Sequence, residues 1–158
     1  MLAASPSIDY KFLIICSPGG AYYSKSLSVY VENKFSRAAP GGAGYAKAAG
    51  NYGASFYPIS IAESKGFDQV LWTDSESHQK IEEVGTMSIV FRLGDKLVTP
   101  KTSDTILDGV TRKSVIQIAK DLGFSVIEKD LTFDDLLDAD ETFFSGTAVE
   151  ITPITKVE

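Results

Sequence analysis

The Gly- and Ala-rich stretch Gly41–Ser55 constrains the fold of this chain more than any other segment. It reads GGAGYAKAAGNYGAS and contains one lysine, Lys47, among residues too small to crowd it. From Ala48 onward the sequence predicts a helix that ends at Gly66. The Lys47 amine is therefore either presented to a bound carbonyl compound or solvated in a flexible loop. Spacing alone favours the solvated lysine, because a lone lysine near glycine is a weak pattern.

Composition limits the classes of protein to consider. The chain has 158 residues and a hydrophobic fraction of 44%, which is sufficient for one domain with a packed core. A net charge of −6 without a basic cluster argues against nucleic-acid binding. No apolar run is long enough to span a bilayer, so we expect no membrane association. With no signal-peptide pattern at its start, the chain is predicted to be cytoplasmic.

The cysteine and histidine counts exclude several kinds of site. Cys16 and His78 are the only residues of their types. We therefore expect no disulfide within the chain and no cysteine- or histidine-based metal site.

Apolar runs separated by Gly and Pro predict strands interleaved with helices, which indicates an α/β or α+β domain. The predicted strands are Ile8–Ser17, Ser26–Glu32, Asp68–Thr73, Ile81–Gly85, Met87–Leu93, Lys96–Thr99, Phe124–Lys129, Glu141–Phe144 and Ala148–Ile151. Two further helices are predicted at Arg112–Leu122 and Thr132–Asp138. The second begins with Thr132 as its N-cap and has Asp135 three residues on, close to a capping box.

Two short segments are candidate anion sites. The run Gly109-Val110-Thr111 precedes a predicted helix and offers backbone N–H groups, a hydroxyl and the positive end of a helix dipole. The turn Ser145-Gly146-Thr147 can direct consecutive N–H groups at an anion. Many helix starts and turns of this kind bind only water, so neither pattern is specific by itself.

Three further side chains have two interpretations each. Glu82 and Glu83 are neighbours on a predicted strand, so they point to opposite faces and at most one enters a site. The alternative is two surface glutamates. Tyr52 lies on the first turns of the helix after Lys47, where it is either a core aromatic or a hydroxyl donor to a ligand.

Several separate motifs together resemble the branched-chain amino acid aminotransferases, which are pyridoxal-phosphate (PLP) enzymes of fold type IV. In the family's order they are KAAGNYGAS, GFDQVLWTD, IEEVGTMSIVF, LDGVTRKSVIQIAKDLG and SGTAVEITPI, and the match runs from about Ile8 to Ile154. The resemblance implies a mixed sheet or pseudo-barrel with helices packed around it. It also implies PLP-dependent transamination of branched-chain L-amino acids (leucine, isoleucine or valine) with 2-oxoglutarate. Amino-acid and 2-oxo-acid substrates and a homodimer follow from the same resemblance.

The resemblance assigns roles residue by residue. Lys47 would form the Schiff base with PLP, which requires a neutral amine and so leads us to expect a buried lysine. Glu83 would face the pyridine nitrogen, and Tyr52 would hydrogen-bond the cofactor's phenolic oxygen. The other assigned residues are Val110, Thr111 and Thr147 at the phosphate, Thr147 and Ala148 at the substrate carboxylate, and Thr86 and Leu107 close to the ring. No metal is implied.

The chain departs from the family at two positions near these residues. Asp108 stands where the family usually has proline, and a carboxylate beside a phosphate site is repulsive unless it turns away to cap the helix. Ser88 replaces a common asparagine.

Family members also have a separate N-terminal domain, which carries a phosphate-binding arginine. We therefore expect residues 1–17 to be the trailing strand of that small domain and residues 18–40 to be the interdomain loop and entry to the large domain. Residues 41–158 would be the PLP-binding large domain without its C-terminal end.

Two alternatives to branched-chain transamination stay open. Another fold-type IV enzyme, a D-amino-acid aminotransferase or an aminodeoxychorismate lyase, would use the same cofactor, but these families lack the tyrosine of the GNYG segment. The second alternative is a truncated, non-catalytic domain that binds PLP weakly or contributes only to assembly.

Overall fold

A computed structural model describes residues 4–158 of the chain. Within these residues the strands are β1 (Leu27–Glu32), β2 (Gln69–Thr73), β3 (Lys80–Val84), β4 (Met87–Leu93), β5 (Lys96–Pro100), β6 (Ser125–Lys129), β7 (Leu131–Thr132), β8 (Glu141–Gly146) and β9 (Glu150–Val157). The helices of the same part of the chain are α1 (Gly50–Gly53), α2 (Phe56–Ser64), α3 (Val110–Asp121) and α4 (Phe133–Leu137). None of these helices is long and apolar enough to cross a bilayer.

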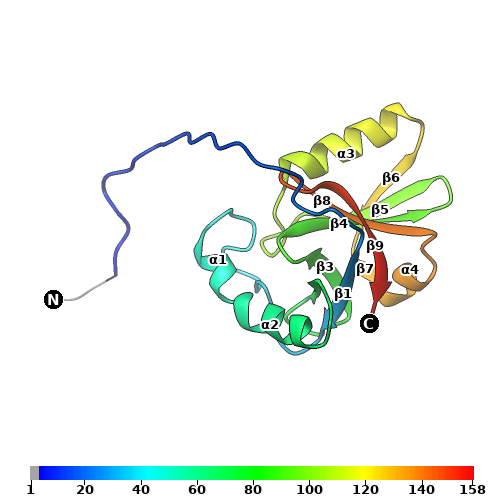
Figure 1. Ribbon diagram of the computed structural model, residues 1–158, viewed down its shortest axis with the longest axis horizontal. Coiled ribbons are helices and arrows are strands. Elements are labelled where there is room, and N and C mark those ends of the chain that lie inside the picture. The colour runs from blue at the N-terminus through cyan, green and yellow to red at the C-terminus, as the bar shows by residue number, and fades with distance from the viewer. Residues whose placement is uncertain (1–3) are drawn as a thin grey trace.

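The strands form one mixed sheet that closes into a barrel (Figure 1). Their order is β6-β5-β4-β8-β9-β1-β2-β3-β7, and an additional pairing of β4 with β3 joins six of them in a ring. Strand β1 is parallel to β2 and β9, and the other pairs of the ring are antiparallel. The predicted mixed sheet or pseudo-barrel with helices around it is therefore confirmed.

Alternating side chains of the ring separate an inner core from two outer ones. The inner core is built from residues such as Leu71, Ile89, Phe91 and Phe144. Their strand neighbours point outward into two smaller apolar clusters. The first cluster lies where α2 packs on β1 and β2, and it contains Ala62, Phe67, Val70 and Trp72. The second lies where α3 packs on β6 and β8, and it contains Val90, Leu97, Ala119 and the partly buried Phe143.

The turn between β3 and β4 closes the ring at Gly85 and Thr86. Gly85 has a φ of +54°, a backbone conformation that favours glycine. Its N–H donates to the Val70 carbonyl at 2.8 Å, and its carbonyl accepts from Trp72 Nε1 at 2.8 Å. The turn is thus anchored to β2. This anchoring fixes the positions of Thr86 within the turn and of Glu83 just before it.

One predicted strand is wrong. Ile8–Ser17 is exposed along its whole length and forms no strand, and Ile8 is 93% exposed. In Figure 1 this segment runs away from the barrel. Its aromatic and β-branched residues favour a strand only where a neighbouring strand completes the hydrogen bonds, and no described residue of the chain does so here.

Other elements differ from the prediction mainly in their bounds. The helix predicted after Ala48 is divided into α1 and α2, because residues 54–55 interrupt it. Helix α3 begins two residues earlier than predicted, at Val110, and β9 continues to Val157 because it pairs with both β8 and β1. The capping box of Thr132 and Asp135 is confirmed at the start of α4.

Close backbone packing at Gly44 fixes the loop that carries Lys47. The Tyr45 N–H donates to the Asp104 carbonyl at 3.0 Å. A Cβ atom on Gly44 would lie 2.8 Å from the Asp104 carbonyl oxygen and 2.9 Å from Thr105 Cα. Backbone atoms cannot swing away as side chains do, so this position accepts only glycine unless the loop moves.

We predict that Gly44→Ala destabilises the protein, whereas Gly53→Ala does not. The first change forces two loops apart and is expected to cost about 1–3 kcal/mol of unfolding free energy. The second adds a Cβ on helix α1 with no atom within 4 Å, so it is expected to be neutral or stabilising by about 0.5–1 kcal/mol. Urea unfolding of both variants measures the difference. Equal stabilities would contradict the role given to Gly44.

Candidate active site

A cavity of about 520 Å³ lies outside the barrel, between the first turn of α3 and the loop that carries Lys47. A smaller adjoining pocket shares Lys47, Glu83, Thr86 and Leu107 with it and adds Tyr52. Every site residue expected from the sequence lines one or both of them: Lys47, Tyr52, Glu83, Thr86, Leu107, Val110, Thr111, Thr147 and Ala148. The fold thus brings together residues that are far apart in the sequence.

The wall of the cavity carries a row of polar side chains on three adjacent strands. Glu83 on β3 is opposite Ser88 on β4, and Ser88 is opposite Ser145 on β8. Directly opposite residues of antiparallel strands point to the same face. Ile89 and Phe144, the neighbours of the serines, point into the inner core, so the serines point outward to the cavity. This polar row lies between the two outer apolar clusters.

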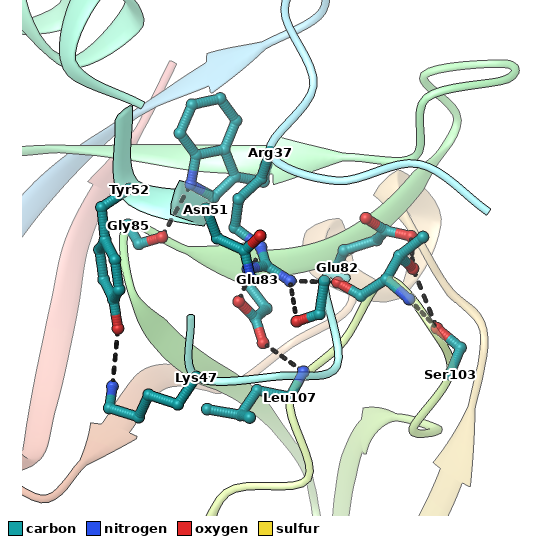
Figure 2. A network of polar contacts seen from close by, with 12 residues as sticks. Arg37, Lys47, Asn51, Tyr52, Glu82, Glu83, Gly85, Ser103 and Leu107 are labelled. Atoms are coloured by element: carbon teal, nitrogen blue, oxygen red, sulfur yellow. Dashed lines mark hydrogen bonds and ion pairs between the residues drawn. The ribbon is translucent and has the colours of Figure 1, made fainter. Parts of the chain in front are cut away.

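Glu83 is held from two directions (Figure 2). Arg37 Nε lies 2.9 Å from Glu83 Oε2, with the two side chains only 9% and 4% exposed. The Leu107 N–H donates to Glu83 Oε1 at 3.0 Å. Burial raises the pKa of Glu83 to about 7, although the Arg37 charge and the Leu107 hydrogen bond both act to lower it. A carboxyl that titrates near neutral pH is thus positioned on the cavity wall.

The neighbouring Glu82 points to the other side of β3. It lines a separate cavity, and its carboxylate accepts a hydrogen bond from the Thr105 hydroxyl at 2.6 Å. The two glutamates thus point to opposite faces, as predicted, and only Glu83 lines the cavity that contains Lys47. The alternative of two surface glutamates is wrong, since both side chains are buried.

Lys47 and Tyr52 converge at the edge of the cavity. Lys47 Nζ donates to the Tyr52 hydroxyl at 2.9 Å (Figure 2). The loop before the lysine is fixed by Asn51, whose Nδ2 donates to the carbonyls of Ala43 and Ala46, each at 2.8 Å. The tyrosine is therefore a half-buried polar partner of the lysine and not a core aromatic.

The expected burial of Lys47 is wrong for this chain. Its side chain is exposed, because the residues around it, such as Ala46, Ala48 and Gly50, are too small to cover it. The small residues that leave space for a ligand at the amine also leave the amine accessible to water.

The opposite end of the cavity is suited to an anion. Helix α3 begins at Val110 after Gly109, an N-cap without a side chain that could satisfy the N–H groups of the first turn. The hydroxyls of Thr111 and Thr147 lie 3.3 Å apart beside these groups. Free N–H groups, the helix dipole and two hydroxyls together favour a negatively charged ligand group.

Asp108 lies on the rim of this anion end. Its carboxylate does not cap α3, since none of the N–H groups of the first turn donates to it. Asp108 instead pairs with Lys113 Nζ at 2.5 Å, and both side chains are largely exposed. The lysine therefore reduces the repulsion that the sequence predicts between Asp108 and an anion, and solvent screens what is left.

Sequence reasoning missed three contributors to the site: Arg37, Ser88 as part of the polar row, and the hydroxyl of Ser145, a residue that was named only for the backbone N–H groups of its turn. No local pattern marks Arg37, since its partner lies far along the chain. The serine row depends on the register of β3, β4 and β8, which the sequence does not state. A weak signal for Asn51 was present in the sequence, because this residue lies in the GNYG segment, four residues after Lys47.

Comparison with known proteins identifies related sequences. The family model described as "Amino-transferase class IV" matches residues 4–157. A probable branched-chain-amino-acid aminotransferase from Staphylococcus epidermidis is 46% identical over 164 residues, covering 98% of this chain and 46% of that protein. The chain thus spans about half the length of the curated relatives that it matches.

Solved structures with the same fold are also known. The branched-chain aminotransferase from the archaeon Thermoproteus uzoniensis, in a crystal structure with norvaline, has a TM-score of 0.79 and 36% identity. The match covers 89% of this chain and 47% of that one.

The branched-chain amino acid aminotransferase from Escherichia coli has a TM-score of 0.76 and 35% identity. That match covers 84% of this chain and 44% of the Escherichia coli chain. A further branched-chain amino acid aminotransferase, complexed with N-(5'-phosphopyridoxyl)-L-glutamate, has a TM-score of 0.76 and 33% identity. It matches over 84% of this chain and 43% of its own.

We predict that Glu83 makes stability fall as pH rises. Its pKa is raised from 4.5 to about 7 on folding, so between these values the folded state binds more protons than the unfolded state. The unfolding free energy of the wild type, relative to Glu83→Gln, should fall by up to about 3 kcal/mol from pH 4.5 to 7 and then level off. Urea unfolding of both proteins across this range measures the difference. A difference that grows with pH would overturn the prediction.

Proposed function

Because the chain belongs to the class IV aminotransferases, we propose that its cavity binds PLP and that the protein transfers the amino group of leucine, isoleucine or valine to 2-oxoglutarate. One observation carries this proposal. The Lys47 amine, the Glu83 carboxyl and the anion end at Thr111 and Thr147 line a single cavity. These are the groups needed to hold an aldehyde, a ring nitrogen and a phosphate.

The residues of the cavity fit PLP from end to end. Lys47 is the covalent tether, and Tyr52, hydrogen-bonded to it, is placed to contact the phenolic oxygen. Glu83 would hold the proton of the ring nitrogen. The N–H groups of Val110 and Thr111 and the hydroxyls of Thr111 and Thr147 would bind the phosphate. When bound, PLP supplies the electron sink that stabilises negative charge at the substrate Cα.

The side chains of this protein supply the proton chemistry. Once the substrate amine has displaced Lys47 from the cofactor, the freed Nζ would be the base that accepts the proton from the substrate Cα, and the Tyr52 hydroxyl, 2.9 Å from it in the chain alone, would keep that nitrogen in place. Glu83 titrates near neutral pH in the chain alone, and a cationic ring nitrogen beside it would lower its pKa. Arg37, at 2.9 Å, restrains the carboxylate in this orientation.

The remaining residues position the ligands. We assign Thr86 and Leu107 to the surroundings of the ring, since both line the cavity next to Glu83. The N–H groups of Thr147 and Ala148, which follow the end of β8, would receive the substrate carboxylate.

The partial match to the relatives supports a division of the chain. We propose that residues 41–158 belong to the PLP-binding large domain, with residues 18–40 as its entry. Residues 1–17, of which 1–3 lie outside the described part of the chain, would be the end of a small domain and would form a strand only when paired with it. The exposed apolar side chains of Ile8, Phe12 and Ile15 are consistent with a segment that packs against another domain. A homodimer and a cytoplasmic location stay predictions.

One observation favours a second candidate function, PLP binding without turnover: the Lys47 side chain is exposed. In that case the cofactor binds and the amino acid does not react.

We predict that the full chain, mixed with PLP and reduced with borohydride, carries a covalent adduct on Lys47. Peptide mass spectrometry locates it. Lys47→Ala should abolish the adduct, whereas Lys120→Ala, on the exposed face of α3, should retain it. Labelling spread over several lysines would contradict the assignment.

In a separate sample that has not been reduced, leucine should convert the bound cofactor to its amine form, which changes the visible spectrum. An unchanged spectrum would support binding without turnover.

We also predict that Asp108→Asn strengthens PLP binding modestly. The change removes a negative charge from the rim of the phosphate site, but Asp108 is half exposed and paired with Lys113. Exposed charge interactions are typically worth up to about 1 kcal/mol, so affinity should rise by no more than about fivefold. Titrations at low and high salt check the cause, because the gain should shrink as salt rises. A gain that is independent of salt would speak against an electrostatic origin.

A further inference from the structure

The hydroxyl of Ser145 is a buried polar group without a partner. The residue is only 2% exposed, and within residues 4–158 its buried Oγ has no hydrogen-bond partner. Burying a hydroxyl without a hydrogen bond is costly, so native structures rarely leave one in this state. Ser145 also lines the cavity. These observations together indicate that a ligand group in the cavity completes its hydrogen bonding.

The position of Ser145 shows which end of the cavity this group would occupy. Ser145 lies on β8, against which α3 packs (Figure 1), and only Gly146 separates it from Thr147. The Thr147 hydroxyl is 3.3 Å from that of Thr111 in the first turn of α3. A Cβ on Gly109, the N-cap of α3, would lie 3.6 Å from the hydroxyl of Ser88, the cross-strand neighbour of Ser145. The N-cap of α3 therefore lies over Ser88, beside Ser145 on the neighbouring strand.

The anion end has few cationic alternatives among the described residues. Arg112 is buried at the start of α3 and lines the cavity; its Nη2 donates to the Pro100 carbonyl at 2.7 Å and to Glu128 at 2.6 Å, whereas its Nε has no partner among the described residues. Lys113 is exposed and paired with Asp108. Apart from Arg112, the donors on this side are neutral, and one more buried hydroxyl is a substantial addition to them.

We propose that Ser145 is a further phosphate-binding residue, whose hydroxyl donates to the phosphate group of a bound phosphomonoester. This rests on the proposed function, in which that ligand is PLP. With Thr111 and Thr147, Ser145 forms a triad of hydroxyls drawn from α3, from β8 and from the turn after it. The rest of the polar row, Ser88 and Glu83, extends from this triad toward the ring end of the cavity.

Comparison of PLP with pyridoxal, which lacks the phosphate, tests the assignment in the full chain. Each dissociation constant is measured by absorbance titration for the wild type and for Ser145→Ala. Loss of one hydrogen bond to a charged group should weaken PLP binding roughly tenfold to a hundredfold. Pyridoxal binding should change by less than about twofold, since it does not use this donor. Inorganic phosphate, used as a competitor of PLP, should also bind more weakly to the variant.

Two further variants separate a binding role from a structural one. Ser145→Cys keeps the side chain's shape and removes the strong donor, so it should reproduce the selective loss even where Ser145→Ala folds poorly. Ser64→Ala, on the exposed end of α2, should leave both dissociation constants unchanged. Thermal melting of every variant checks its folding.

The outcomes are distinct. An equal loss of PLP and pyridoxal affinity in Ser145→Cys would place the hydroxyl elsewhere or make its role structural, and no loss would also overturn the proposal. Failure of wild-type Lys47 to form an adduct would instead remove the proposed function. Weaker competition by inorganic phosphate with unchanged PLP affinity would assign Ser145 to free phosphate and overturn its role toward the cofactor.

Discussion

The buried pair of Arg37 and Glu83 is the contact on which the site depends. The two side chains lie 2.9 Å apart and are almost fully buried, so each would be a costly isolated charge without the other. Glu83 is on β3, Arg37 is in the loop that follows β1, and the Leu107 N–H comes from the segment before α3. One carboxylate thus connects three segments, and these segments carry the lysine, the wall and the anion end of the cavity.

The barrel explains why the site lies outside the sheet and not within it. Large apolar side chains fill the interior, so no ligand can enter there. The outer face is covered by α2 on one side and α3 on the other, each over its own apolar cluster. Between them the strands present Glu83, Ser88 and Ser145. The gap between the two helices therefore has a polar wall, a lysine at its edge and a helix N-terminus at its end.

Much of this arrangement could be predicted from the sequence, with failures that have physical causes. The capping box at α4 and the start of α3 depend on residues a few positions apart, and both were predicted, the second to within two residues. Ile8–Ser17 has the residues of a strand, but pairing depends on a neighbour that local sequence cannot supply. Lys47 was placed correctly at the cavity by its motif, whereas its exposure depends on which side chains pack over it.

Sequence alone determined most of the elements, the family and which residues line the cavity of the proposed site, because turn residues, periodicity and motifs are local properties. The tertiary structure decided which of these groups share a cavity, how the Glu83 carboxyl titrates and where Ser145 points. These properties arise from strand register, burial and contacts between distant segments. Arg37 carries no local signature and Ser145 was marked only as part of a turn, since the surroundings of both side chains exist only once the barrel has closed.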